Sequence, residues 1–191
     1  MIRINLKIIL ILISLQYNIS IFCQTIQNRP SDWAIKISVS KLSNLYMVND
    51  SIYRCEQPDS LDFVLIHTIG IKSVLNLRVN YSDKDLIDGL PLYKYNVQMI
   101  PFNFGDKEIV RAMKILKNSP KPVIVHCLYG SDRTGAVIAM YRIIFQDWTK
   151  EEALNEMIYG GYNFHSIFIN IPKYIKEADI INIKKEISNQ N

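Results

Sequence analysis

Short apolar runs alternate with stretches of helical periodicity along most of the chain. Residues 71–77, 93–100 and 122–126 are short runs rich in β-branched and aromatic side chains, a pattern typical of strands. Over residues 107–117 the apolar positions fall mostly on one side of a helix. The alternation of strands with helices predicts an α/β fold, in which one sheet carries helices on both faces.

Turn and capping residues add further elements to this pattern. Asn49-Asp50 lies between two short apolar segments and predicts a hairpin, because both side chains tolerate a tight turn. Asp59 or Ser60 can cap a helix that ends before Gly70. Three more helices are predicted over residues 136–145, 150–159 and 172–183.

Residues 1–23 have the composition of a secretory signal peptide. Arg3 and Lys7 precede an apolar run, and amide side chains interrupt the apolar character after it. A helix that spans a bilayer needs about 20 apolar residues, so we expect a leader that is cleaved near its end and no stable membrane anchor. Residues 24–43 lack clear periodicity and are predicted to lead into a single domain over residues 44–191.

The composition excludes several classes of protein. Of the 191 residues, 49% are hydrophobic and 21% are charged, as in an ordinary globular domain. A net charge of +4 is too small to indicate a nucleic-acid partner. Cys23, Cys55 and Cys127 are widely and irregularly spaced, so no disulfide framework and no metal-binding pair is predicted. We therefore expect neither a metal nor another cofactor.

The most informative stretch is the polar loop after the third apolar run. Residues 126–135 read His-Cys-Leu-Tyr-Gly-Ser-Asp-Arg-Thr-Gly and connect a predicted strand to a predicted helix. A short loop that leads into a helix N-terminus turns several backbone N–H groups toward one point, where the helix dipole adds positive potential. Such a phosphate-binding loop favours a dianion. Cys127 opens this loop, so the same potential stabilises its thiolate and makes it a nucleophile.

Other residues of the loop fit the same chemistry. The planar guanidinium of Arg133 can bind two phosphate oxygens, and the hydroxyl of Thr134 can donate to the sulfur when the thiolate departs. Gly130 permits a backbone in which the amides converge, and Gly135 lets the start of the helix pack closely on the sheet. The residues expected around the bound phosphate are His126, Leu128, Tyr129, Gly130 and Ser131, with Tyr129 at the mouth of the pocket.

These residues resemble the signature of cysteine-dependent protein tyrosine phosphatases. The family pattern His-Cys-x-x-Gly-x-x-Arg-[Ser/Thr]-Gly matches residues 126–135. The stretches 53–58, 70–78 and 145–172 are similar to the small exported dual-specificity-like phosphatases of Gram-negative bacteria. Cys55 departs from this resemblance, since such enzymes have Ser at its place.

The resemblance implies a fold, an activity and a location. The implied enzyme hydrolyses phosphomonoesters through a phosphocysteine intermediate at Cys127, with an aspartic general acid and no metal. Its implied substrate is a phosphorylated protein, foremost one with phosphotyrosine, and its implied location is the periplasm or the exterior of a bacterial cell. Cys55 is expected to be a packed thiol.

Two aspartates compete for the role of general acid. Asp106 follows the loop after the strand 93–100, the region from which related enzymes extend a mobile acid loop. The same residue can instead be only the N-cap of a helix that begins at Lys107. Asp132 lies within the phosphate-binding loop, where a carboxylate beside a dianion is unfavourable unless it is protonated. We favour Asp106.

Other functions stay open alongside this one. The sequence Asp-Arg-Thr at 132–134 is also found in several lipid-directed members of the family, which favours an inositol phosphate or phosphoinositide phosphatase as one alternative. A non-catalytic phosphate-recognition module is an alternative from another class. Outside the loop, Arg54 and Arg78 are expected on the surface, and His67 and His165 are expected to be structural.

Overall fold

Six strands form one mixed sheet in the part of the chain that the computed structural model describes, residues 29–38 and 41–189. They are β1 (Ile35–Lys36), β2 (Tyr46–Asn49), β3 (Ile52–Cys55), β4 (Ser73–Asn76), β5 (Tyr93–Asn96) and β6 (Val123–His126). Their order across the sheet is β1-β2-β3-β6-β4-β5. The sheet belongs to a unit that begins at Trp33. The predicted signal peptide lies outside the described residues.

β2 and β3 form the predicted hairpin. They pair antiparallel, with Tyr46 opposite Arg54. The side chain of Asn49 makes the turn, because its Oδ1 accepts hydrogen bonds from the backbone N–H groups of Ser51 and Ile52, each at 2.9 Å. β1 pairs with the other edge of β2, which brings part of the expected lead-in segment into the sheet.

The centre of the sheet is parallel, and its register aligns the carboxyl ends of three strands. β6 lies between β3 and β4, and both Cys55 and Asn76 are the register partners of His126. In open α/β sheets, ligands bind outside the carboxyl ends of the strands. The residues that follow His126 therefore emerge at the edge where β3 and β4 also end.

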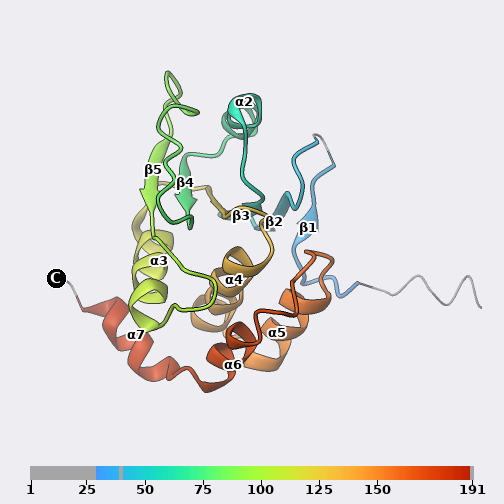
Figure 1. Cartoon of the computed structure of the whole chain (residues 1–191), viewed down its shortest axis with the longest axis vertical. Coiled ribbons are helices and arrows are strands. Elements are labelled where there is room, and N and C mark those ends of the chain that lie inside the picture. Colours follow the sequence, from blue (N-terminus) through green and yellow to red (C-terminus); the bar gives the residue numbers. More distant parts are fainter. Residues whose placement is uncertain (1–28, 39–40, 190–191) are drawn as a thin grey trace, which may run out of the picture. The chain divides into compact units, whose positions relative to one another are not determined.

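Helices cover both faces of the sheet, as the alternating pattern predicts. α2 (Ser60–Thr68) packs on one face, where Phe63 and Ile66 join a buried cluster with Val74 and Ile124. On the other side lie α3 (Asp106–Asn118) and α4 (Asp132–Phe145), and α5 (Lys150–Tyr159), α6 (Asn170–Glu177) and α7 (Ile180–Ser188) pack against these two helices. Figure 1 shows α3 to α7 gathered together and α2 apart from them, beyond the strands. Among the described residues, no helix is both long and apolar enough to span a membrane.

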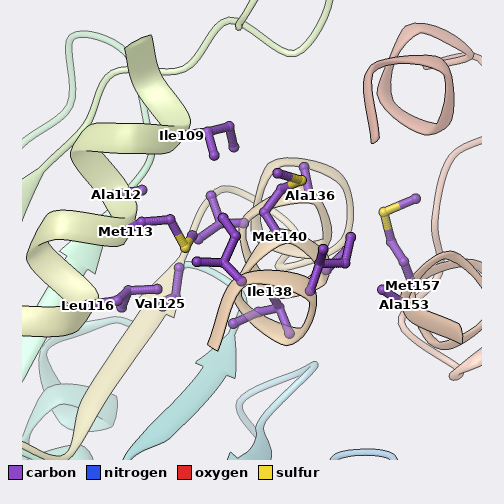
Figure 2. Packing of buried hydrophobic residues seen from close by; sticks show 14 of the residues in the cluster. Ile109, Ala112, Met113, Leu116, Val125, Ala136, Ile138, Met140, Ala153 and Met157 are labelled. Atoms are coloured by element: carbon purple, nitrogen blue, oxygen red, sulfur yellow. The ribbon is translucent and has the colours of Figure 1, made fainter. Parts of the chain in front are cut away.

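α4 is the central helix of the larger core. Figure 2 shows Ile138 and Met140 of α4 between Met113 of α3 and Met157 of α5. Gly135 permits this close packing, since a Cβ at its position would lie only 3.0 Å from Cγ of Met157. The close approach predicted for Gly135 is therefore made to α5 and not to the sheet.

The starts of α3 and α4 differ from the prediction. α3 begins at Asp106, so Gly105 is its N-cap and the capping role considered for Asp106 is wrong. α4 begins at Asp132, four residues before the apolar run from Ala136. Residues Asp132 to Thr134 of the loop already belong to the helix. Because they are polar, the pattern of apolar positions does not reveal that the helix begins there.

The single helix predicted over residues 172–183 is wrong. α6 ends at Glu177, and α7 begins at Ile180. The carboxylate of Asp179 caps α7, because it accepts a hydrogen bond from the N–H of Asn182 at 3.0 Å. A capping side chain within one continuous apolar pattern can start a new helix.

Candidate active site

The loop between β6 and α4 is anchored through its carbonyl oxygens. Those of Leu128, Tyr129 and Gly130 each accept a hydrogen bond from a residue outside the loop. The respective donors are the backbone N–H of Gln57 (3.1 Å), Nδ2 of Asn44 (2.7 Å) and Nη2 of Arg54 (2.6 Å). Three consecutive peptide groups are thus held with their C=O groups directed outward.

The N–H groups of the same planar peptides point the opposite way. Within the described part of the chain, the backbone N–H groups of residues 128–134 make no hydrogen bond. The last of these residues form the first turn of α4, where helix geometry supplies no partner for an N–H group. The result is an anion-binding cradle beside Cys127, whose side chain is buried.

Only glycine fits at position 130. The φ angle of Gly130 is +67°, in the left-handed region that other residues rarely adopt. A Cβ there would also lie 2.4 Å from the carbonyl oxygen of Cys55. The loop therefore packs directly on the backbone at the end of β3.

Arg54 lies under the loop and is 1% exposed, so the expectation of a surface residue is wrong. Its guanidinium carbon lies 3.6 Å from the centre of the Tyr162 ring, and Tyr162 donates its hydroxyl to Oε1 of Glu156 at 2.9 Å. Burial lowers the pKa of Arg54, while the electrostatic influence of Tyr162, Glu156 and Cys127 counteracts that shift. Since a guanidinium stays charged in proteins, a positive charge is fixed close to Cys127.

Arg133 and Thr134 have polar groups that the protein itself leaves largely unused. Among the described residues, the guanidinium of Arg133 reaches only the carbonyl oxygen of Met99, at 3.5 Å. The hydroxyl of Thr134 is buried and has no hydrogen-bond partner in the same part of the chain. Buried polar groups are nearly always paired, so this hydroxyl is available to a group that enters the site.

His126 fixes the start of the loop from inside the protein. Its Nε2 lies 2.9 Å from Oδ2 of Asp83, and Gln57 donates to the other oxygen of Asp83 at 2.9 Å. Burial alone would raise the pKa of Asp83, but the hydrogen bond and charge of His126, with further bonds from Gln57 and Asn76, lower it. Asp83 therefore stays a carboxylate, and the buried imidazole supports the loop.

Asp132 pairs with His165, which lies between α5 and α6. The backbone N–H of His165 donates to Oδ1 of Asp132 at 2.9 Å, and its Nδ1 lies 2.9 Å from Oδ2. The ring of His165 also contacts the ring of Tyr129, with the two centroids 5.5 Å apart. His165 thus touches two residues of the phosphate-binding loop.

Asp106 lies outside the loop, at the start of α3. Its Oδ1 accepts a hydrogen bond from the hydroxyl of Tyr174 at 2.7 Å. Burial raises the pKa of Tyr174, and the bond to Asp106 raises it further, so Tyr174 stays a donor. Nδ2 of Asn170 donates to the carbonyl of Pro101 at 2.8 Å, and the ring of Phe104 packs on that of Tyr174. α6 thereby holds the segment in which we expected a mobile acid loop.

Cys55 is fully buried and forms no disulfide with Cys127. Burial raises the pKa of its thiol well above the ordinary value, and the charges of Cys127 and nearby carboxylates add to the shift. A buried neutral thiol is unreactive. The geometry therefore agrees with the packed thiol that we expected.

Several supports of the loop escaped the sequence analysis. For Arg54 the sequence contains one indication of burial, because a cation within the short apolar strand that leads to Cys55 can face inward. For Asp83 and His165 it contains no indication, because they lie in irregular segments, 43 and 33 residues from their partners. Only the folded chain brings these side chains to the loop.

The assembled groups suit phosphoryl transfer to a cysteine. A cradle of free N–H groups can hold the phosphate oxygens, Arg133 is free to bind two of them, and the thiol of Cys127 lies at the start of the cradle, where a nucleophile is needed. In the part of the chain that the structure describes, no three His, Cys, Asp or Glu side chains are grouped to hold a metal ion. The predicted residues Cys127 to Thr134 thus share one loop, whereas Asp106 is bound to α6.

Comparisons with known proteins agree with this geometry. Residues 39–191 match the model of the tyrosine phosphatase family. The dual specificity protein phosphatase TpbA of Pseudomonas aeruginosa is 27% identical over 168 residues, which cover 87% of this chain and 76% of TpbA. Inositol diphosphatase DSP4 of Arabidopsis thaliana is 26% identical over 151 residues, 74% of each protein.

A solved structure shares the fold. The crystal structure of a P. aeruginosa TpbA variant in complex with pTyr is similar with a TM-score of 0.76 and 26% identity, over 85% of this chain and 100% of that one. The family match covers the sheet from β2 onward, the loop and every helix of the described residues. The chain therefore belongs to the tyrosine phosphatase family and is a cysteine-dependent phosphatase.

Proposed function

We propose that the protein removes phosphate from phosphotyrosine in protein substrates, with Cys127 as the nucleophile. The observation that carries this proposal is the outward anchoring of the carbonyls of Leu128, Tyr129 and Gly130, which leaves the loop N–H groups free for a phosphate. TpbA, named a dual specificity protein phosphatase, has been solved with pTyr, which supports an aryl phosphate as substrate.

The chemistry has two steps. The sulfur of Cys127 attacks phosphorus, an S–P bond forms, and the bond to the phenolic oxygen breaks as that oxygen takes a proton from the general acid. Water then attacks the phosphocysteine, which releases inorganic phosphate and the thiolate. In both steps the loop N–H groups and Arg133 hold the equatorial oxygens, and Thr134 can donate to the departing sulfur.

The mouth of the loop favours a ring-bearing substrate. Tyr129 is 57% exposed and Leu128 is 39% exposed, although both belong to the phosphate-binding loop. An aromatic and an aliphatic side chain beside a polar cradle suit a phenyl phosphate, because the phenyl ring can pack on them.

An inositol phosphate is the second candidate substrate. The observation that favours it is the similarity to inositol diphosphatase DSP4, whose identity with this chain is close to that of TpbA. An inositol polyphosphate carries several anionic groups, for which the apolar side chains of Leu128 and Tyr129 offer no binding partner. We therefore place phosphotyrosine first.

We also propose that the protein is exported to the periplasm or beyond. The cations Arg3 and Lys7 before the apolar run support this location.

A substrate panel tests the proposed activity. Initial rates are compared at equal concentrations of a phosphotyrosine peptide, a phosphoserine peptide and an inositol diphosphate, with Cys127→Ser as the control for contaminating phosphatases. We expect the highest kcat/KM on the phosphotyrosine peptide and no turnover by Cys127→Ser. A preference for the inositol diphosphate would make an inositol phosphate the first candidate substrate in place of phosphotyrosine. Binding without turnover of any substrate would indicate a phosphate-recognition module.

A further inference from the structure

The anion-binding loop contains a negative charge of its own. Asp132 is the first residue of α4 and directly precedes Arg133, yet its side chain is only 7% exposed. A carboxylate at this place partly cancels the positive potential of Arg133 and of the helix N-terminus. It also repels an incoming phosphate dianion, so a loop built to bind phosphate needs a compensating group.

His165 is placed to supply that compensation. Both oxygens of Asp132 are engaged by His165: Oδ1 by its backbone N–H at 2.9 Å, and Oδ2 by its Nδ1 at 2.9 Å. In the described part of the chain, His165 is the side chain found to pair with the Asp132 carboxylate. These contacts also fix the direction in which the carboxylate points.

Neighbouring rings hold the imidazole in this position. The ring of Tyr129 lies 5.5 Å from that of His165, and the ring of Phe168 lies 6.3 Å from it at nearly a right angle. Of the residues that the structure describes, the titratable side chains found in contact with His165 are Tyr129 and Asp132 of the loop, and Arg133 directly follows Asp132. Because His165 is 45% exposed, its removal leaves no buried cavity.

We propose that His165 is a positioning residue for phosphate binding: its backbone N–H and its ring Nδ1 hold the two oxygens of Asp132, which weakens the repulsion between that carboxylate and the phosphate and keeps the carboxylate directed away from it. The inference rests on the proposed function, since it concerns the same loop. It assigns His165 no proton transfer to the substrate. His165 should affect the affinity for the phosphate dianion. This effect should vanish when the side chain at position 132 carries no charge.

Binding measurements on an inactive enzyme test this proposal. The affinities for phosphotyrosine and for inorganic phosphate are measured by calorimetry in Cys127→Ser, alone and combined with His165→Gln. We expect His165→Gln to weaken both affinities about tenfold, the scale of one hydrogen-bonded charge. Addition of Asp132→Asn to His165→Gln should restore most of that loss. The control is His67→Gln, a histidine on α2, which should leave both affinities unchanged.

Three outcomes contradict the proposal. Unchanged affinities in His165→Gln would show that Asp132 needs no compensation. An Asp132→Asn, His165→Gln double variant that binds no better than His165→Gln would show a merely structural contact. A fall of kcat in otherwise active His165→Gln, with affinity preserved, would show that His165 transfers a proton. If Cys127→Ser with His165 intact fails to bind either ligand, the proposed function itself fails.

Discussion

At the scale of single residues, Gly130 is required both by its backbone conformation and by its close contact with β3. Its φ of +67° disfavours any side chain, and a Cβ would press on the carbonyl of Cys55. Gly89 is a matched case, because its φ is +76° but a Cβ there would meet nothing within 4 Å. A substitution at Gly89 therefore adds backbone strain alone, whereas a substitution at Gly130 adds the same strain and a clash with the backbone of Cys55.

We therefore predict that Gly130→Ala is far more harmful than Gly89→Ala. Gly89→Ala should lower the free energy of unfolding by about 1–2 kcal/mol, the strain of a left-handed Ala. Gly130→Ala should lose more stability than that and also most phosphate affinity, because the loop must shift away from β3. Chemical denaturation and phosphate binding measure the two effects. Equal losses in both variants would contradict the role given to the contact with Cys55.

Some residues of the site can be identified from the sequence alone, and others cannot. Cys127 and Arg133 were identifiable because their spacing lies within one short loop and needs no tertiary structure. Arg54 was misjudged, because a strand-end arginine is usually solvated and only the register of β3 beside β6 places it under Gly130. The partnership of Asp132 with His165 depends on a segment that returns to the loop from the far end of α5.

At the scale of elements, the connection between β4 and β5 supports the end of β6 through Asp83. The pKa of Asp83 is lowered in the folded protein. A carboxylate with a lowered pKa stabilises the fold above its ordinary pKa of about 3.9, and this contribution is lost as the pH falls through the lower folded value.

We predict that Asp83→Asn lowers the free energy of unfolding by about 1–3 kcal/mol at pH 7, because His126 loses a charged partner. The difference from the wild-type protein should shrink at pH values below about 3.9, where protonation of Asp83 removes the same interaction. Thermal unfolding as a function of pH measures it. Asp85→Asn, an exposed neighbour, is the control. A difference that persists undiminished in acid would show that Asp83 acts by packing alone.

Asp106, at the start of α3, is the candidate general acid. If Asp106 is the general acid, Asp106→Asn should slow the hydrolysis of phosphotyrosine by about 10²–10⁴ but leave activated aryl phosphates much less affected, since their leaving groups need no proton. Asp106 must then leave the hydroxyl of Tyr174, so Tyr174→Phe should keep activity. Normal hydrolysis of phosphotyrosine by Asp106→Asn, together with its loss in Asp132→Asn, would reverse the assignment.

The elements also differ in how well a pattern predicts them. The hairpin, α2 and α5 follow from local turn and capping residues, and their prediction was confirmed. The break between α6 and α7 was missed, because the apolar positions continue through it and only the cap at Asp179 marks it. The hydrogen bonds from Asn170 and Tyr174 to residues 101–106 are tertiary contacts, which no local sequence pattern contains.

At the scale of the whole molecule, parts of the chain that are far apart in sequence converge on one loop. The strands β3 and β6 bring Arg54 and Cys127 to the same edge of the sheet, α4 contributes the free N–H groups of its first turn, and the segment after α5 contributes His165. A site that depends on so many distant contacts requires the complete domain.

We predict that the mature protein begins near residue 24. A leader with two cations before an apolar run is recognised and removed during secretion. Mass spectrometry of protein isolated from its native source should show a chain that lacks residues 1–23, recovered with the periplasmic or extracellular fraction. An intact N-terminus on protein from the cytosol would contradict the predicted export.

Rapid acid quench followed by peptide mass spectrometry shows whether Cys127 carries the phosphoryl group during turnover. With a phosphotyrosine substrate, we expect a phosphoryl group on the peptide that contains Cys127, and none in Cys127→Ser, which should also be inactive. Phosphotyrosine hydrolysis by Cys127→Ser at a rate near that of the wild-type enzyme would contradict this role of Cys127.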